Sequence, residues 1–234
     1  TYAVREGRMN LRGTARFNRL ADVAPLTGSA GSEWTVTQTS RAAPIRITAD
    51  ARGRNVASPI AALQQLAGAE PRVRLSAVVR DGRFVIESGA VTGAGVRATM
   101  NGRVADNGAI SATAKGALTR PLDLSGISLG SLDFTTSITG NTTAPRVALD
   151  LADGKVSAGG VTITGVTGDV DARLGEAIAG DFSLRGVSGE KAFLTSGRIQ
   201  GGEGDFRILN LVARLGDLRL NAPRLAYSDG AFSA

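Results

Sequence analysis

Cysteine and histidine are both absent from the 234-residue chain. Disulfide bonds cannot form, so cysteine usage says nothing about the redox compartment. Metal sites built from cysteine and histidine are excluded. So is every triad or general base that uses histidine. Little remains of the usual catalytic repertoire, and we expect the protein not to be an enzyme.

Aromatic residues are scarce, at 4% of the chain, while glycine occurs 31 times. The interior must therefore be built from small and medium aliphatic side chains. No run of about 20 apolar residues exists, so no segment predicts a membrane-spanning helix. Because the chain opens inside a strand-like pattern, we expect an excised segment of a longer protein, with any membrane anchor outside it.

Charge is distributed unevenly around the formal net value of +6. Residues 1–103 contain 15 Arg and 7 acids, whereas residues 104–234 contain 12 basic and 14 acidic residues. Arg8, Arg12 and Arg16 share one strand face, and Arg72 and Arg74 share another. We interpret them as a solvated polar surface, with phospholipid headgroups as a second interpretation. Nucleic acid is not expected as a partner, since its single-stranded grooves need aromatic platforms.

Alternation of apolar and polar residues with period two dominates the chain and predicts half-exposed strands. The pattern is clear at Met9, Leu11, Ala15 and Phe17, with arginines between them. It returns at Ile45–Ala49, Val73–Val79, Phe84–Ile86, Val96–Met100, Ile110–Ala114, Leu132–Ile138 and Val147–Leu151. The fold class predicted is all-β: an elongated, curved antiparallel meander sheet with one or two short helices.

Gly-Asp pairs recur in the last third of the chain, at 168–169, 180–181, 204–205 and 216–217. Each pair is followed by an apolar-polar-apolar triplet. Glycine and aspartate suit tight turns, so the spacing predicts units of one turn and one strand. Such regular spacing is typical of a meandering antiparallel sheet.

Two stretches depart from the strand pattern. Ser58 to Gly68 predicts a short helix with Ser58 as N-cap, Pro59 at the first helical position and Gly68 closing it. Residues 20–44 predict a helical turn followed by a mobile connection. We expect a single β-rich segment over residues 1–234, with a possible sub-boundary in the 19–44 loop.

Four motifs resemble known binding or catalytic sites, but the sequence around each of them does not fit such a site. Gly201–Asp205 lacks the recurrence of a calcium-binding turn, and Gly93–Ala98 is followed by strand rather than the helix that a dinucleotide site needs. Ser188 and Lys191 have the spacing of a nucleophile pair but lie in a predicted loop. Carboxylates such as Asp169 and Asp171 are scattered, so a glycosidase is a distant alternative. No cofactor and no metal is predicted.

The chain resembles a middle section of the bacterial AsmA-like superfamily, which includes TamB and the YdbH-type proteins. Three stretches carry the resemblance: the short helix before a strand series at Ser58–Gly68, the Gly-bounded strand at Gly102–Gly108, and Gly204–Leu220. The resemblance implies a periplasmic segment anchored to the inner membrane elsewhere in the protein. It also implies a curved sheet with an oily groove (a β-taco) that moves phospholipids toward the outer membrane, and it implies no catalytic residues.

The alternating aliphatic residues are the candidates for lining such a groove, where phospholipid acyl chains would be the partners. Each buried methylene of a lipid tail contributes about 0.8 kcal/mol. The candidates are Val73, Leu75, Phe84, Ile86, Val96, Met100, Phe134, Ile138, Phe206, Ile208, Leu218 and Leu220. The alternatives are a TamB-like scaffold that binds outer-membrane proteins at a sheet edge, and a structural or adhesive β-solenoid passenger. Alternation alone does not distinguish a groove from a packed core.

Overall fold

The computed structural model describes residues 2–5, 8–20, 26–124, 126–175, 177–202, 205–228 and 231–233. Within these ranges the side chains of residues 2–5, 202, 205–206, 227–228 and 231–233 are not described. The chain divides into two compact units, Thr1–Leu122 and Asp123–Ala234.

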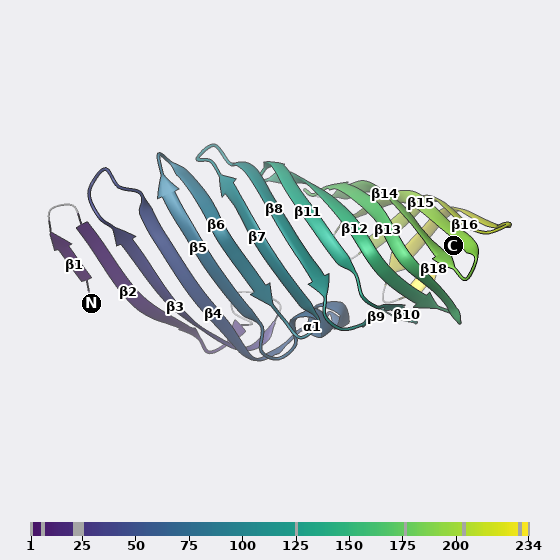
Figure 1. Ribbon diagram of the computed structural model, residues 1–234, viewed down its shortest axis with the longest axis horizontal. Helices are drawn as coiled ribbons and strands as arrows, with labels where there is room; N and C mark the ends of the chain where they lie inside the picture. The colour runs from purple at the N-terminus through teal and green to yellow at the C-terminus, as the bar shows by residue number, and fades with distance from the viewer. Residues whose placement is uncertain are drawn as a thin grey trace. The chain divides into compact units, whose positions relative to one another are not determined.

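Long strands make up nearly all of both units (Figure 1). The first contains β1 (Tyr2–Arg5), β2 (Arg8–Phe17), β3 (Thr27–Gln38), β4 (Ile45–Ala57), α1 (Ala61–Ala67), β5 (Arg72–Arg80), β6 (Arg83–Thr92), β7 (Val96–Val104) and β8 (Ala109–Leu118). The short strand β9 (Leu122–Leu124) spans the division. The second unit contains β10 (Ile127–Leu129), β11 (Asp133–Asn141), β12 (Ala144–Ala158), β13 (Val161–Arg173), β14 (Ile178–Ser188), β15 (Lys191–Gly202), β16 (Asp205–Leu215), β17 (Leu218–Ser228) and β18 (Ala231–Ser233).

Consecutive strands pair antiparallel along the chain in each unit, β1 through β8 in the first and β11 through β18 in the second. Because each of these connections returns to the neighbouring strand, both units are open meanders, to which the short β10 adds a pairing with β12. The predicted all-β fold with a curved, open antiparallel sheet is therefore confirmed. No helix in the described part of the chain is long and apolar enough to cross a membrane.

Curvature in these sheets has an identifiable local source. Asn55 in β4, Asp153 in β12 and Asn210 in β16 have positive φ angles of 51°, 52° and 53°. Near each of them the pairing register with a neighbouring strand shifts. Such bulges bend a strand and increase its twist. Asparagine and aspartate tolerate this conformation better than other residues with a side chain.

The single described helix, α1, lies at the end of strands in the first unit. The backbone N–H groups of Ala94 and Gly95, between β6 and β7, donate to the carbonyls of Ala67 and Leu66 at 3.1 and 3.0 Å. A Cβ on Gly93 would lie 3.0 Å from the Cα of Ala67, so the glycines flanking Ala94 permit this close approach. The Gly93–Ala98 motif therefore serves the packing of the helix end.

The helix was predicted correctly but its start was not. It begins at Ala61 with Ile60 as the N-cap residue, so Pro59 is not at the first helical position. It ends at Ala67, and Gly68, whose φ is 67°, is the C-cap residue as predicted. Ser58 does not cap the helix. Its hydroxyl accepts a hydrogen bond from the Ile60 N–H at 3.1 Å, in the turn before the helix. The side chain of Gln64 takes part in this turn, because its Oε1 accepts from the Ser58 N–H at 2.8 Å.

Two further expectations were wrong. The stretch at 20–44 is not a mobile connection, because β3 occupies Thr27–Gln38 and pairs with β2 and β4 on its two sides. The expected helical turn falls on residues 21–25, which lie outside the described residues. Pairing on both edges compensates for its low strand propensity. The Gly-Asp pairs at 168–169 and 180–181 lie inside β13 and β14, not in turns. Only the pair at 216–217 forms a turn among the described residues, and Gly204 lies outside them.

Candidate functional site

In the first unit the apolar side chains share one face of the sheet. Leu75 pairs with Ala49 on one side and Gly89 on the other, and Gly89 pairs with Met100. Because side chains two residues apart point the same way in a strand, this register aligns the predicted groove residues of the unit. Val73, Leu75, Phe84, Ile86, Val96 and Met100 all lie on this apolar face.

The second unit repeats the arrangement. Phe134 pairs with Leu151, and Ile138 pairs with Val147. Ile208 pairs with Ile199 and Leu225, and Leu220 pairs with Ala213. The registers place Phe134, Ile138, Phe206, Ile208, Leu218 and Leu220 on one face of this unit. The side chain of Phe206 lies outside the described residues.

None of the eleven candidate side chains that the structure describes is buried. Val73 is 45% exposed, Met100 37%, Leu218 68% and Leu220 57%, and the others are half-buried. The buried hydrophobic residues among those described are Val56, Ala77, Leu122 and Val166. The predicted apolar residues therefore form an accessible face, not a packed core.

Glycines on this face accept the large side chains of neighbouring strands. A Cβ on Gly89 would lie 2.5 Å from Cγ of Met100, and one on Gly197 would lie 3.0 Å from Cε1 of Phe182. Large side chains thus lie flat over glycines of the next strand. A sheet with few aromatic residues thus uses them to cover backbone that glycine leaves bare.

The opposite face of the first unit is polar and holds an open hollow of about 1170 Å³. Residues from seven strands, β2 to β8, line it, including Arg12, Glu33, Asp50, Arg74 and Lys115. Serine and threonine are common between them, and the Thr35 and Thr48 hydroxyls are 2.5 Å apart. Leu75 and Met100 also border the hollow. Since the side chains of these two residues point to the apolar face, it is their backbone that forms the floor of the hollow.

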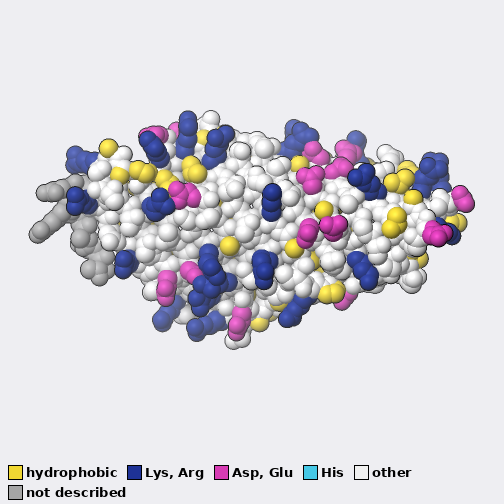
Figure 2. Space-filling model, viewed as in Figure 1, with side chains coloured by type: hydrophobic (Ala, Val, Ile, Leu, Met, Phe, Trp, Pro, Cys, Tyr) yellow, Lys and Arg dark blue, Asp and Glu magenta, His cyan; other side chains and the backbone are white. Residues whose placement is uncertain are grey.

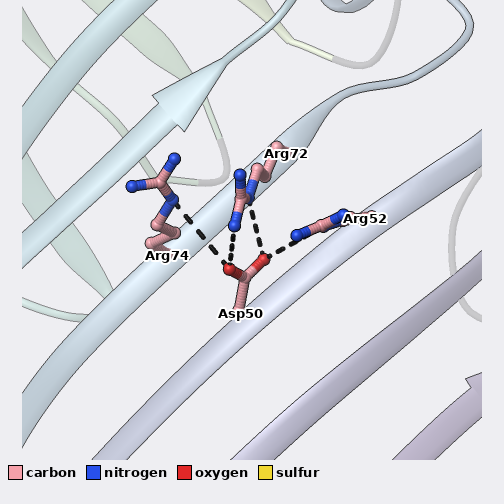
Figure 3. Close-up of polar contacts among 4 residues, drawn as sticks. All are labelled: Asp50, Arg52, Arg72 and Arg74. Carbon is pink, nitrogen blue, oxygen red and sulfur yellow. Dashed lines mark hydrogen bonds and ion pairs between the residues drawn. The ribbon is translucent and has the colours of Figure 1, made fainter.

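Asp50 is the centre of a charge cluster on the polar face (Figure 3). Arg72 makes a bidentate contact with it: Nε donates to Oδ1 at 2.9 Å and Nη2 donates to Oδ2. Arg52 Nε lies 3.6 Å from Oδ1, and Arg74 Nε lies 3.9 Å from Oδ2. One carboxylate thus faces three guanidinium groups.

The hydrogen bond from Arg72 lowers the pKa of Asp50 below its ordinary value, aided by the positive charges of Arg72, Arg52 and Arg74. Reciprocally, the contact raises the pKa of Arg72. The second unit has a similar pair, in which Arg146 Nε donates to Asp171 Oδ1 at 2.7 Å. This hydrogen bond lowers the pKa of Asp171. Both carboxylates are therefore held in the charged form, which does not suit a general acid.

A second ion pair bridges across β5. Arg46 Nη1 on β4 lies 2.7 Å from Glu87 Oε2 on β6, and the Ser76 hydroxyl donates to the same oxygen at 3.3 Å. Sequence analysis did not single out Asp50, Glu87 or Lys115. It also assigned Arg12 and Arg74 to separate faces, whereas the registers place them on the same one. The sequence did offer one signal for this cluster: Asp50 is the single acid among the arginines Arg46, Arg52 and Arg54 of the same strand.

Among the residues that the structure describes, no group of three or more carboxylates could hold a metal ion. Comparison with known proteins gives no match: no family model, no curated protein and no solved structure is similar to this chain at a significant level. The interpretation of the site therefore depends on its own geometry.

Proposed function

We propose that this protein binds phospholipid acyl chains along the apolar face of its sheet and conducts them within the bacterial cell envelope. The resemblance to the AsmA-like superfamily supports this interpretation. In this proposal the chain is a periplasmic segment of a protein that is anchored to the inner membrane elsewhere, and lipids move toward the outer membrane.

One observation carries the proposal: in each unit, aliphatic side chains form a continuous face that remains accessible to solvent. Val73 and Met100 in the first unit, and Leu218 and Leu220 in the second, are 37% to 68% exposed. Large contiguous apolar patches are rare on soluble proteins and mark sites of interaction. An occupant rich in hydrocarbon is the simplest complement to such a face.

The chemistry of the face fits an acyl chain better than a compact ligand. Its side chains offer no described hydrogen-bonding cluster, so an occupant is held by contact area alone. Burial of each methylene contributes about 0.8 kcal/mol, and the contribution accumulates along the length of a chain. Binding without specific contacts also allows movement from strand to strand, which conduction requires.

The test uses a fluorescent fatty acid whose emission rises in apolar surroundings, titrated with the full chain. Met100→Glu places a charge on the apolar face at an exposed position, where the fold should tolerate it. Since an acyl chain cannot bury an unpaired charge, we expect the affinity to fall by about tenfold or more.

Thr99→Glu is the matched control, because Thr99 is the exposed neighbour of Met100 on the opposite face. It adds the same charge to the same strand, and we expect the affinity for the fatty acid to be unchanged. Equal losses in the two variants, with circular dichroism showing both folded, would contradict binding at the apolar face.

A further inference from the structure

The polar face of the first unit carries a large excess of positive charge. Strands β2, β4 and β5 each contribute three cationic side chains to this face, β7 contributes two, and β6 and β8 one each. The acids on the same face are Glu33, Asp50 and Glu87. The surplus is therefore ten positive charges on one face of one unit. Lys and Arg side chains gather along both margins of this face in Figure 2.

The acids of the face neutralise only a part of this charge. Asp50 lies within 4 Å of Arg52, Arg72 and Arg74, and Glu87 pairs with Arg46. Asp81, in the adjacent turn, pairs with Arg80 at 3.4 Å. The other eight cations, which include Arg12, Arg97 and Arg103, have no carboxylate within 4 Å among the described residues. Charge without internal partners attracts an external anion.

The distribution of the charge indicates the shape of that anion. The cations extend over seven strands, a width of about 29 Å at the usual spacing of neighbouring strands. A single small anion would contact few of them. A broad anionic surface would contact many at once, and guanidinium groups bind phosphate by paired hydrogen bonds.

The aromatic residues favour a lipid surface over nucleic acid. Phe17, Trp34 and Phe84 all lie on the apolar face by their strand register. No described side chain of the polar face is aromatic, so it offers no platform on which bases could stack. Phosphate headgroups need only charge and hydrogen-bond donors, which this face supplies.

We propose that the polar face of the first unit docks the protein on a bilayer surface of anionic phospholipid. This goes beyond the proposed binding of acyl chains, since it concerns the opposite face of the sheet and a headgroup layer. The two activities are separable, and either can fail without the other.

Co-sedimentation of the full chain with vesicles tests the docking. We expect binding to vesicles of phosphatidylcholine and phosphatidylglycerol, weakening as salt is added, and little binding to phosphatidylcholine alone. Neutralising Arg12, Arg97 and Arg103 together (Arg→Gln) should weaken binding on the order of a hundredfold, since each arginine near an anionic bilayer contributes about fivefold. A second triple variant, in which Arg16, Arg54 and Lys115 are replaced by Gln, should lose a similar amount of vesicle binding.

The control neutralises Arg207, Arg214 and Arg224, three exposed arginines of the second unit. It removes the same net charge, and we expect a much smaller effect on vesicle binding. The proposal is overturned if the control variant loses as much vesicle binding as the triple variants, or if the protein binds neutral vesicles equally well. It is also overturned if the protein binds single-stranded DNA but not vesicles. Retention of the fluorescent fatty acid by the triple variants would show that the apolar face is intact.

Discussion

Trp34 on β3 lies across Gly13 on β2, its register partner, so that a Cβ on Gly13 would lie 2.7 Å from the indole Cε2. The only tryptophan of the chain thus covers the backbone of the neighbouring strand. On an open sheet, which has no second layer to fill, a large side chain gains contact area by lying over a glycine. Gly13 is therefore a packing position, not a turn residue.

The first prediction tests this packing. Gly13→Ala should lower the free energy of unfolding by about 1–3 kcal/mol, the usual cost of overpacking, because the indole ring must shift. Gly31→Ala is the control, since a Cβ there would meet nothing within 4 Å and its φ is not positive. We expect the control to be neutral or slightly stabilising. Urea unfolding measures both, and an equal loss in the two variants would refute the role of Gly13.

The second prediction concerns acid stability. The pKa of Asp50 is lowered in the folded protein, chiefly by the hydrogen bond from Arg72, so its contribution to stability is fully present above the unfolded pKa of about 3.9. That contribution is lost as the pH falls through the lower folded pKa. Asp50→Asn should therefore unfold at lower temperature than the unmodified protein at pH 7, and the difference should shrink at acid pH. Melting curves across this range measure it, and a difference that grows toward low pH would be contrary to expectation.

The third prediction concerns the bend in β16. Asn210 has a φ of 53°, which costs a side-chain-bearing residue roughly 1–2 kcal/mol and a β-branched residue at least as much. Asn210→Val should be destabilising by about that amount, whereas Asn210→Gly should be close to neutral. Asn221→Val, at an exposed position of β17 without positive φ, is the control and should have little effect. If both valine variants unfold at the same denaturant concentration, the positive φ at Asn210 does not strain a β-branched residue and the prediction fails.

Alternation in the sequence predicted the strands and their faces well, because period two is a direct consequence of strand geometry. Val73, Leu75, Ala77 and Val79 lie together on one face of β5, as their spacing indicated. The β3 strand was missed because its glycines and serines have low strand propensity. Its formation depends on partners on both edges, and these are not local in sequence.

The alternation of apolar and polar residues could not predict the ion pairs of the polar face. Asp50 on β4 meets Arg72 on β5, and Arg46 on β4 meets Glu87 on β6, and only the pairing register brings the side chains of each pair together. The bulges at Asp153 and Asn210 were also missed, since Asn and Asp are equally common in ordinary turns. For the same reason the Gly-Asp pairs were assigned to turns, although Gly168 and Gly180 accept the close approach of Leu184 and Ala172 inside the sheet.

Photo-crosslinking in cells tests the central claim, binding of lipid tails at the apolar face, most directly. A photoreactive amino acid replaces Leu75 or Ile208 on the apolar face, and Ser76 or Arg207, the adjacent residues on the opposite face, in the controls. We expect phospholipid to be captured through its acyl chains at Leu75 and Ile208. Capture through acyl chains should be scarce at Ser76 and Arg207, since the proposed docking brings only headgroups to the polar face. The account is contradicted if the two apolar positions capture protein alone, or if all four positions capture lipid equally through the acyl chains.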